Sequence, residues 1–215
     1  MTAARSTPSN GRSPAGWRGQ FACPTGPLGW IAGQLMALGN EPLNRLAAEL
    51  LDVQPADRVL EIGFGPGKLI QRLARRATQG LVAGIDLSAV MVRQATRRNR
   101  PFIRQGHVAL YQGAVSHLPF PDQQFTKACA VNSFQFWPRP EDDLREVRRV
   151  LRDGGLLLLC LRQHDPTARI QLVPGFTVQE IAAIQELVRR AGFRDVQVQE
   201  RRAGRQRVAV VTARR

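Results

Sequence analysis

The sequence of 215 residues contains only three cysteines and no long hydrophobic run. Cys23, Cys129 and Cys160 lie far apart without a C-x-x-C pair, which excludes a disulfide framework and an ordinary zinc cluster, so no metal site is predicted. No apolar run approaches the roughly 18 residues of a membrane-spanning helix. Residues 1–19 also lack the apolar middle of a signal peptide. We therefore expect a cytoplasmic protein with no membrane span.

Acidic residues and lysine are also scarce. The chain has 17 acidic and 31 basic residues, a net charge of +14, and its only lysines are Lys68 and Lys127. A charge of this sign favours an anionic partner such as nucleic acid, because basic side chains neutralise phosphates. However, an excess of arginine over lysine is also typical of a GC-rich coding sequence. The arginines between 93 and 104 fit a solvated helix face. We therefore do not favour a nucleic-acid partner.

The chain divides into a tail, an arm and one domain. Residues 1–19 are rich in Ser, Pro, Gly and Arg, which predicts a disordered tail. Residues 20–52 carry apolar residues at helical spacing, typical of a helical arm, and we expect this arm to act as a lid over the substrate. Residues 53–215 form the main domain, and a hydrophobic content of 43% provides it with a core.

Short apolar runs alternate with helical patterns along this domain. Strands are predicted at 58–62, 81–85, 107–111, 127–131, 156–161, 195–200 and 206–212. Helices are predicted at 69–77, 88–101, 141–151 and 177–191. Alternation of this kind indicates an α/β fold with a mostly parallel sheet covered on both faces.

A glycine turn follows the first predicted strand. Its sequence, Gly63-Phe64-Gly65-Pro66-Gly67-Lys68, lacks the spacing of a P-loop, and Lys68 stands where a dinucleotide fingerprint has its third glycine. Such a turn still lets a ligand approach the backbone closely. Asp86 comes 19 residues after Gly67 at the end of the second strand, where an acid accepts hydrogen bonds from ribose hydroxyls. The pattern predicts a nucleotide-like ligand, with nicotinamide-dependent dehydrogenation as a less favoured alternative.

Four motifs in order resemble the class I S-adenosylmethionine (SAM) dependent methyltransferases, especially the small-molecule branch similar to ubiquinone/menaquinone biosynthesis methyltransferases. The motifs are Val59-Leu60-Glu61-Ile62-Gly63-Phe64-Gly65-Pro66-Gly67, Gly84-Ile85-Asp86-Leu87-Ser88, Leu118-Pro119-Phe120-Pro121-Asp122, and residues 144–155. The resemblance implies a Rossmann-like sheet of seven strands, mostly parallel with an antiparallel last strand. It also implies SAM as the cofactor and S-adenosylhomocysteine (SAH) as its product.

The resemblance assigns cofactor roles to particular residues. Glu61, Gly63, Phe64, Gly65, Pro66 and Gly67 would surround the methionine part of SAM, Asp86 would bind the ribose, and Leu87 would lie beside the adenine. Ala114, Val115 and Asn132 complete the predicted cofactor set. Ala114 departs from the family pattern, which often has Gly-Asp-Ala where this chain has Gly113-Ala114-Val115. The adenine would then be held without that acid.

The segment after the fourth strand resembles the place where the family's methyl acceptor approaches. Its Ser133, Phe134, Phe136 and Trp137, with Trp30 from the arm, are the predicted substrate-binding residues. His164, and after it His117, are the candidate catalytic bases for a hydroxyl acceptor. We expect direct methyl transfer to a small, partly apolar molecule. An RNA methyltransferase and a SAM-binding protein without catalysis remain alternatives.

Overall fold

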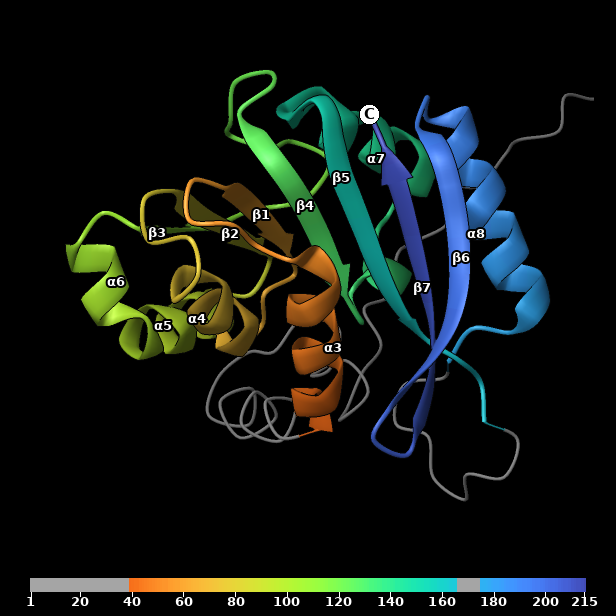
Figure 1. Cartoon of the computed structure of the whole chain (residues 1–215), viewed down its shortest axis with the longest axis horizontal. Coiled ribbons are helices and arrows are strands. Elements are labelled where there is room, and N and C mark those ends of the chain that lie inside the picture. The colour runs from red at the N-terminus through yellow and green to blue at the C-terminus, as the bar shows by residue number, and fades with distance from the viewer. Residues whose placement is uncertain (1–38, 166–174) are drawn as a thin grey trace, which may run out of the picture.

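The computed structural model describes residues 39–165 and 175–215 (Figure 1). The predicted tail, the first part of the predicted arm and Trp30 lie outside these residues. Helix α3 (Glu41–Leu51) precedes the sheet. The further elements are β1 (Arg58–Ile62), α4 (Lys68–Ala74), β2 (Leu81–Asp86), α5 (Ala89–Arg98), α6 (Arg100–Arg104), β3 (Val108–Gln112), β4 (Phe125–Val131), a 3₁₀ turn (Phe134–Phe136), α7 (Pro140–Val150), β5 (Leu151–Arg162), α8 (Val178–Arg190), β6 (Arg194–Ala203) and β7 (Gln206–Arg214).

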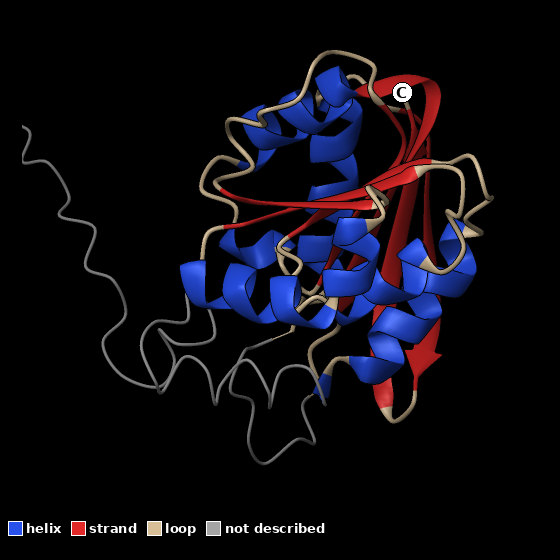
Figure 2. Ribbon diagram, turned by 90° about the vertical axis from the view of Figure 1, so that its left-hand side faces the viewer, coloured by secondary structure: helices blue, strands red, loops and turns tan. Residues whose placement is uncertain are grey.

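The strands form one seven-stranded sheet in the order β3-β2-β1-β4-β5-β7-β6. Strands β1 to β5 pair in parallel, whereas β7 runs antiparallel to both β5 and β6. Helices cover both sides of the sheet (Figure 2). The predicted fold class, including the antiparallel last strand, is therefore confirmed.

Each face of the sheet carries its own hydrophobic core. Leu60 and Ile62 of β1 contribute to the core shared with α7 and α8, while Val59 contributes to the core shared with α3 and α4. Alternate side chains of a strand point to opposite faces, so a strand covered on both faces is apolar along its length. This burial on both faces explains why the residues of β1 on either side of Glu61 are apolar.

Several element boundaries differ from the sequence prediction, among them the end of the helix after β2 and the start of β5. The helix expected over 88–101 ends at Arg98, and a short second helix, α6, follows with Pro101 in its first turn. Proline is tolerated there because the first helical N–H groups have no partner within the helix. Strand β5 begins at Leu151 rather than at residue 156, and its pairing with β4 is irregular between Phe125 and Lys127. None of the helices in the described ranges has the length and apolarity to cross a membrane.

Candidate cofactor and acceptor site

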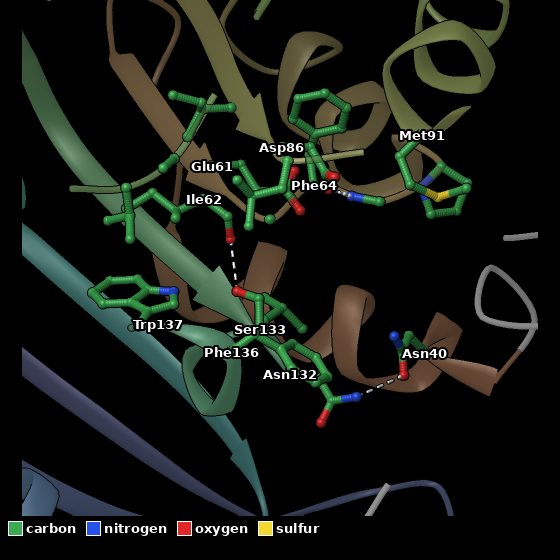
Figure 3. A pocket seen from close by; sticks show the side chains of 18 of the residues that line it. Asn40, Glu61, Ile62, Phe64, Asp86, Met91, Asn132, Ser133, Phe136 and Trp137 are labelled. Carbon is green, nitrogen blue, oxygen red and sulfur yellow. Dashed lines mark hydrogen bonds between the residues drawn. The ribbon is translucent and has the colours of Figure 1, made fainter. Parts of the chain in front are cut away.

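A cavity of about 260 Å³ opens at the carboxyl ends of β1, β2 and β4 (Figure 3). In open α/β sheets, ligands bind at this edge, where neighbouring connections leave in opposite directions. The cavity is lined by Asn40, Asn44, Glu61, Ile62, Gly63, Phe64, Gly65, Pro66, Lys68, Ile85, Asp86, Leu87, Met91, Gly113, Ala114, Val115, Val131, Asn132, Ser133, Phe136, Trp137 and Pro138. Most of the predicted cofactor set thus meets in one place.

The three glycines of the turn have positive φ values of 72°, 53° and 76°, but they differ in their surroundings. A Cβ at Gly63 would lie 2.5 Å from the Ser133 Cβ, and one at Gly67 would lie 2.6 Å from the Ala95 Cβ. At Gly65 a Cβ would meet no protein atom within 4 Å. Gly63 and Gly67 are therefore required by packing within the protein, whereas the space beside Gly65 is open to a ligand. Gly67 does not line the cavity.

Asp86 lies at the end of β2 and connects the turn to the next helix. Its Oδ2 accepts a hydrogen bond from the Gly65 N–H at 2.8 Å, and its Oδ1 accepts one from the Ser88 N–H at 2.9 Å. Burial raises the pKa of Asp86, while these two N–H groups favour its charged form. The carboxylate lines the cavity with acceptor capacity left for the hydroxyl groups of a ligand.

Glu61 brings a second carboxyl group into the cavity. It is 3% exposed, and its Oε2 has no hydrogen-bond partner among the described residues. Burial and the negative charge of Asp86 raise its pKa well above the ordinary value of 4.5. A backbone hydrogen bond from Ile70 favours the charged form but leaves Oε2 unsatisfied, and a buried carboxylate oxygen without a partner is costly. This site therefore fits a ligand that supplies hydrogen-bond donors or positive charge.

The wall beyond β2 and β3 is apolar. Leu87 is 49% exposed, which is unusual for a large apolar side chain, and it borders the cavity together with Met91, Ala114 and Val115. The cavity-lining Gly113 N–H is already bonded to the Asp86 carbonyl at 3.0 Å. This wall thus offers apolar contact to a flat ring. It has no carboxylate after β3, as predicted from Ala114, which stands where the family often has an aspartate.

The opposite wall comes from the segment after β4. Phe136 and Trp137 line the cavity, and the Ser133 hydroxyl donates to the Ile62 carbonyl at 2.7 Å. Phe134 points away into the core, where its ring lies 4.9 Å from that of Trp137. Asn132 closes the end of β4 with a positive φ of 52°, a conformation that asparagine tolerates better than most residues.

The two predicted bases lie outside the cavity. His164 is exposed just beyond β5, where its backbone N–H donates to the Phe176 carbonyl. His117 is exposed on the loop after β3. Neither is among the lining residues, so a catalytic role for either stays a prediction.

Helix α3 supplies two lining residues that the sequence analysis missed, Asn40 and Asn44. Asn40 precedes the helix, but its side chain makes no capping hydrogen bond. Figure 3 shows it facing Asn132 across the lower part of the cavity. An asparagine shortly before a proline is ordinarily interpreted as a helix start, so this role had no separate signal in the sequence.

Comparison with known proteins decides the family. A model described as "Methyltransferase domain" matches residues 59–155. The "Uncharacterized methyltransferase YdaC" of Bacillus subtilis (strain 168) is 31% identical over 169 residues, which cover 79% of this chain and 89% of YdaC. The chain belongs to the SAM-dependent methyltransferases. Its cofactor is therefore SAM.

Two further similarities concern this methyltransferase. The crystal structure of a SAM dependent methyltransferase from Aquifex aeolicus superimposes with a TM-score of 0.66 at 21% identity, covering 80% of this chain and 88% of that one, which supports the fold. The "Ubiquinone/menaquinone biosynthesis C-methyltransferase UbiE" of Pseudomonas savastanoi pv. phaseolicola is 32% identical over 127 residues, 59% of this chain and 49% of that protein. This chain spans about half the length of that protein.

Proposed function

We propose that this methyltransferase transfers a methyl group from SAM to a small, partly apolar molecule by direct displacement. The observation that carries the proposal is the division of one cavity into two parts. Two acids and a glycine turn lie on one side, and Phe136 and Trp137 lie on the other. The similarity to a quinone-biosynthesis methyltransferase supports an acceptor of this kind.

We assign the cofactor side from its hydrogen-bonding groups and from the open space beside Gly65. We assign Asp86 to the ribose hydroxyls, because its carboxylate faces the cavity beside the Gly65 N–H. Glu61 and the turn at Gly63 to Gly67 would hold the methionine part, whose amino group matches the unpartnered Glu61 Oε2. Leu87, Ala114 and Val115 would contact the adenine through apolar surface.

The chain's own residues chiefly position the reactants. When bound, SAM supplies a methyl group activated by a positively charged sulfur. The cavity's ionisable side chains are Glu61, Lys68 and Asp86, and Lys68 is paired with Glu41 at 3.4 Å. No histidine is among the lining residues, so we expect the lining residues to act by aligning the acceptor and excluding water, and a base role for His164 or His117 stays a prediction. Alignment of this kind supplies several of the about 7–11 kcal/mol available from full positioning.

Measurement of where a labelled methyl group arrives tests this proposal. The wild-type protein is incubated with tritiated SAM and a cell extract that is separated into small molecules and RNA. We expect label in the small-molecule fraction, with little change as the salt concentration rises. Label confined to RNA, with transfer that falls steeply with salt, would replace the proposal with an RNA methyltransferase. SAM binding without transfer into either fraction would indicate a protein that binds the cofactor without catalysis.

A further inference from the structure

Arg162 ends β5 at the same edge of the sheet as the cavity. Its Nη2 donates to the Asn40 Oδ1 at 3.1 Å, and Asn40 lines the cavity. The Asn132 amide lies 3.5 Å from the same oxygen. Arg162 itself is not a lining residue; its guanidinium group lies behind this wall, one hydrogen bond away from the cavity on the acceptor side.

This guanidinium has no carboxylate partner. Its Nε is buried without a hydrogen-bond acceptor. All 17 acidic residues of the chain lie in the described ranges, because residues 1–38 and 166–174 contain neither Asp nor Glu. No ion pair joins any of them to Arg162. By contrast, the partly buried Arg149 pairs with Glu146 at 2.8 Å and Asp122 at 2.7 Å.

The surroundings hold Arg162 in place without neutralising it. Asn40 stands at a position where asparagine commonly caps a helix, yet its side-chain oxygen bonds to Arg162 instead. The Gln135 amide donates to the Asn132 carbonyl at 3.0 Å, which fixes the neighbouring wall. Burial lowers the pKa of Arg162, since removal from water disfavours the charged form. A half-buried cation of this kind is costly unless an anion joins it.

We propose that Arg162, oriented by Asn40, binds an anionic oxygen group of the methyl acceptor, a carboxylate or a phosphate. This inference rests on the proposed function, because it names the class of acceptor that enters the same cavity. The aromatic wall would contact the apolar part of the acceptor, and the guanidinium fork suits a planar group of oxygens. Arg162 would therefore determine specificity, whereas the cofactor is held by other residues.

Fractionation of the acceptor by charge tests the inference. Small molecules from a cell extract are passed over an anion-exchange resin at neutral pH, and each fraction is incubated with the wild-type protein and tritiated SAM. We expect label mainly in products of the retained fraction. Phosphatase treatment of that fraction before the assay separates the two chemistries: loss of transfer identifies a phosphate, and survival identifies a carboxylate.

Variants tie the charge of the acceptor to Arg162. With the retained fraction as acceptor, Arg162→Gln should raise the KM at least about tenfold, as expected for loss of a charged hydrogen bond, and leave the affinity for SAH unchanged. Arg162→Lys should recover part of the loss, and Asn40→Ala should raise the KM less than Arg162→Gln does. The matched control is Arg214→Gln, at the opposite edge of the sheet, where the side chain bonds the Gly154 carbonyl. It should not change the KM.

The outcomes separate the two proposals. Label only in the unretained fraction, or an unchanged KM in a folded Arg162→Gln protein, would overturn the anionic acceptor and leave small-molecule methylation intact. No label in any small-molecule fraction would contradict the proposed function, and the inference would fall with it. If Arg162→Gln does not fold, Arg162→Lys and Asn40→Ala provide the same comparison of KM with SAH affinity.

Discussion

The Asp86 carboxylate accepts a hydrogen bond from the Gly65 N–H at 2.8 Å, which ties the end of β2 to the glycine turn after β1. The two residues are 21 positions apart in the sequence, but they lie on neighbouring parallel strands that end at one edge. This bond holds the turn in the conformation that leaves Gly65 facing open space. The cavity is therefore shaped before a ligand enters it, which reduces the ordering cost of binding.

Replacement of Glu61 by glutamine should stabilise the protein at neutral pH. Its raised pKa means that the folded state holds a proton which the unfolded state has already released, so the glutamate costs stability as pH rises above its ordinary value of 4.5. We expect Glu61→Gln to raise the free energy of unfolding by about 1–3 kcal/mol at pH 8, and by less at pH 5. Urea unfolding at both pH values measures this difference.

The matched control for Glu61 is Glu49→Gln, on an exposed position of α3. Its effect should stay within about 0.5 kcal/mol at either pH. A Glu61→Gln protein that is less stable than the wild type at pH 8 would show that the carboxylate is compensated within the protein, contrary to our description of the site.

Two alanine substitutions in the glycine turn should have different effects. Gly67→Ala should destabilise the fold, because its Cβ would lie 2.6 Å from the Ala95 Cβ. Gly65→Ala should fold with a cost of about 1 kcal/mol for its positive φ, and it should weaken SAH binding because the new methyl group enters the cavity. Thermal unfolding and titration with SAH measure the two effects. A Gly65→Ala protein with full affinity would place the ligand elsewhere.

Removal of the Ser133 hydroxyl should change the stability of the protein more than its KM for the acceptor. This buried hydroxyl donates its proton to the Ile62 carbonyl at 2.7 Å. It therefore has no proton left to donate to an acceptor. We expect Ser133→Ala to lower the free energy of unfolding by about 1–2 kcal/mol, and to leave the KM for the acceptor within a few fold. A normal stability combined with a large rise in KM would instead confirm the predicted substrate-binding role of Ser133.

The sequence predicts the sheet well, and it predicts which residues gather around the glycine turn, because both depend on local patterns. Buried parallel strands show unbroken apolar runs, and the acids at Glu61 and Asp86 stand at fixed distances from the turn. The acceptor side depends on tertiary packing. Phe134 and Phe136 differ by two positions, but the 3₁₀ turn directs only Phe136 into the cavity.

Contributions from distant elements had no signal in the sequence. Asn40 and Arg162 are 122 residues apart, and they meet only because α3 packs against the sheet beside the end of β5. The same limit applies to the glycines, since the sequence does not distinguish Gly65, which faces the cavity, from Gly67, which packs against α5.

Titration of the Asp86→Ala and Asp86→Asn proteins with SAM tests the central claim most directly, that this cavity holds the cofactor through Asp86. Each charged hydrogen bond to the ribose is worth about 1.5–3 kcal/mol, so SAM affinity should fall at least about tenfold in the alanine protein. The asparagine protein, which keeps the size of the side chain and loses its charge, should also bind more weakly. An unchanged SAM affinity in a folded Asp86→Ala protein would contradict the account and place the cofactor elsewhere.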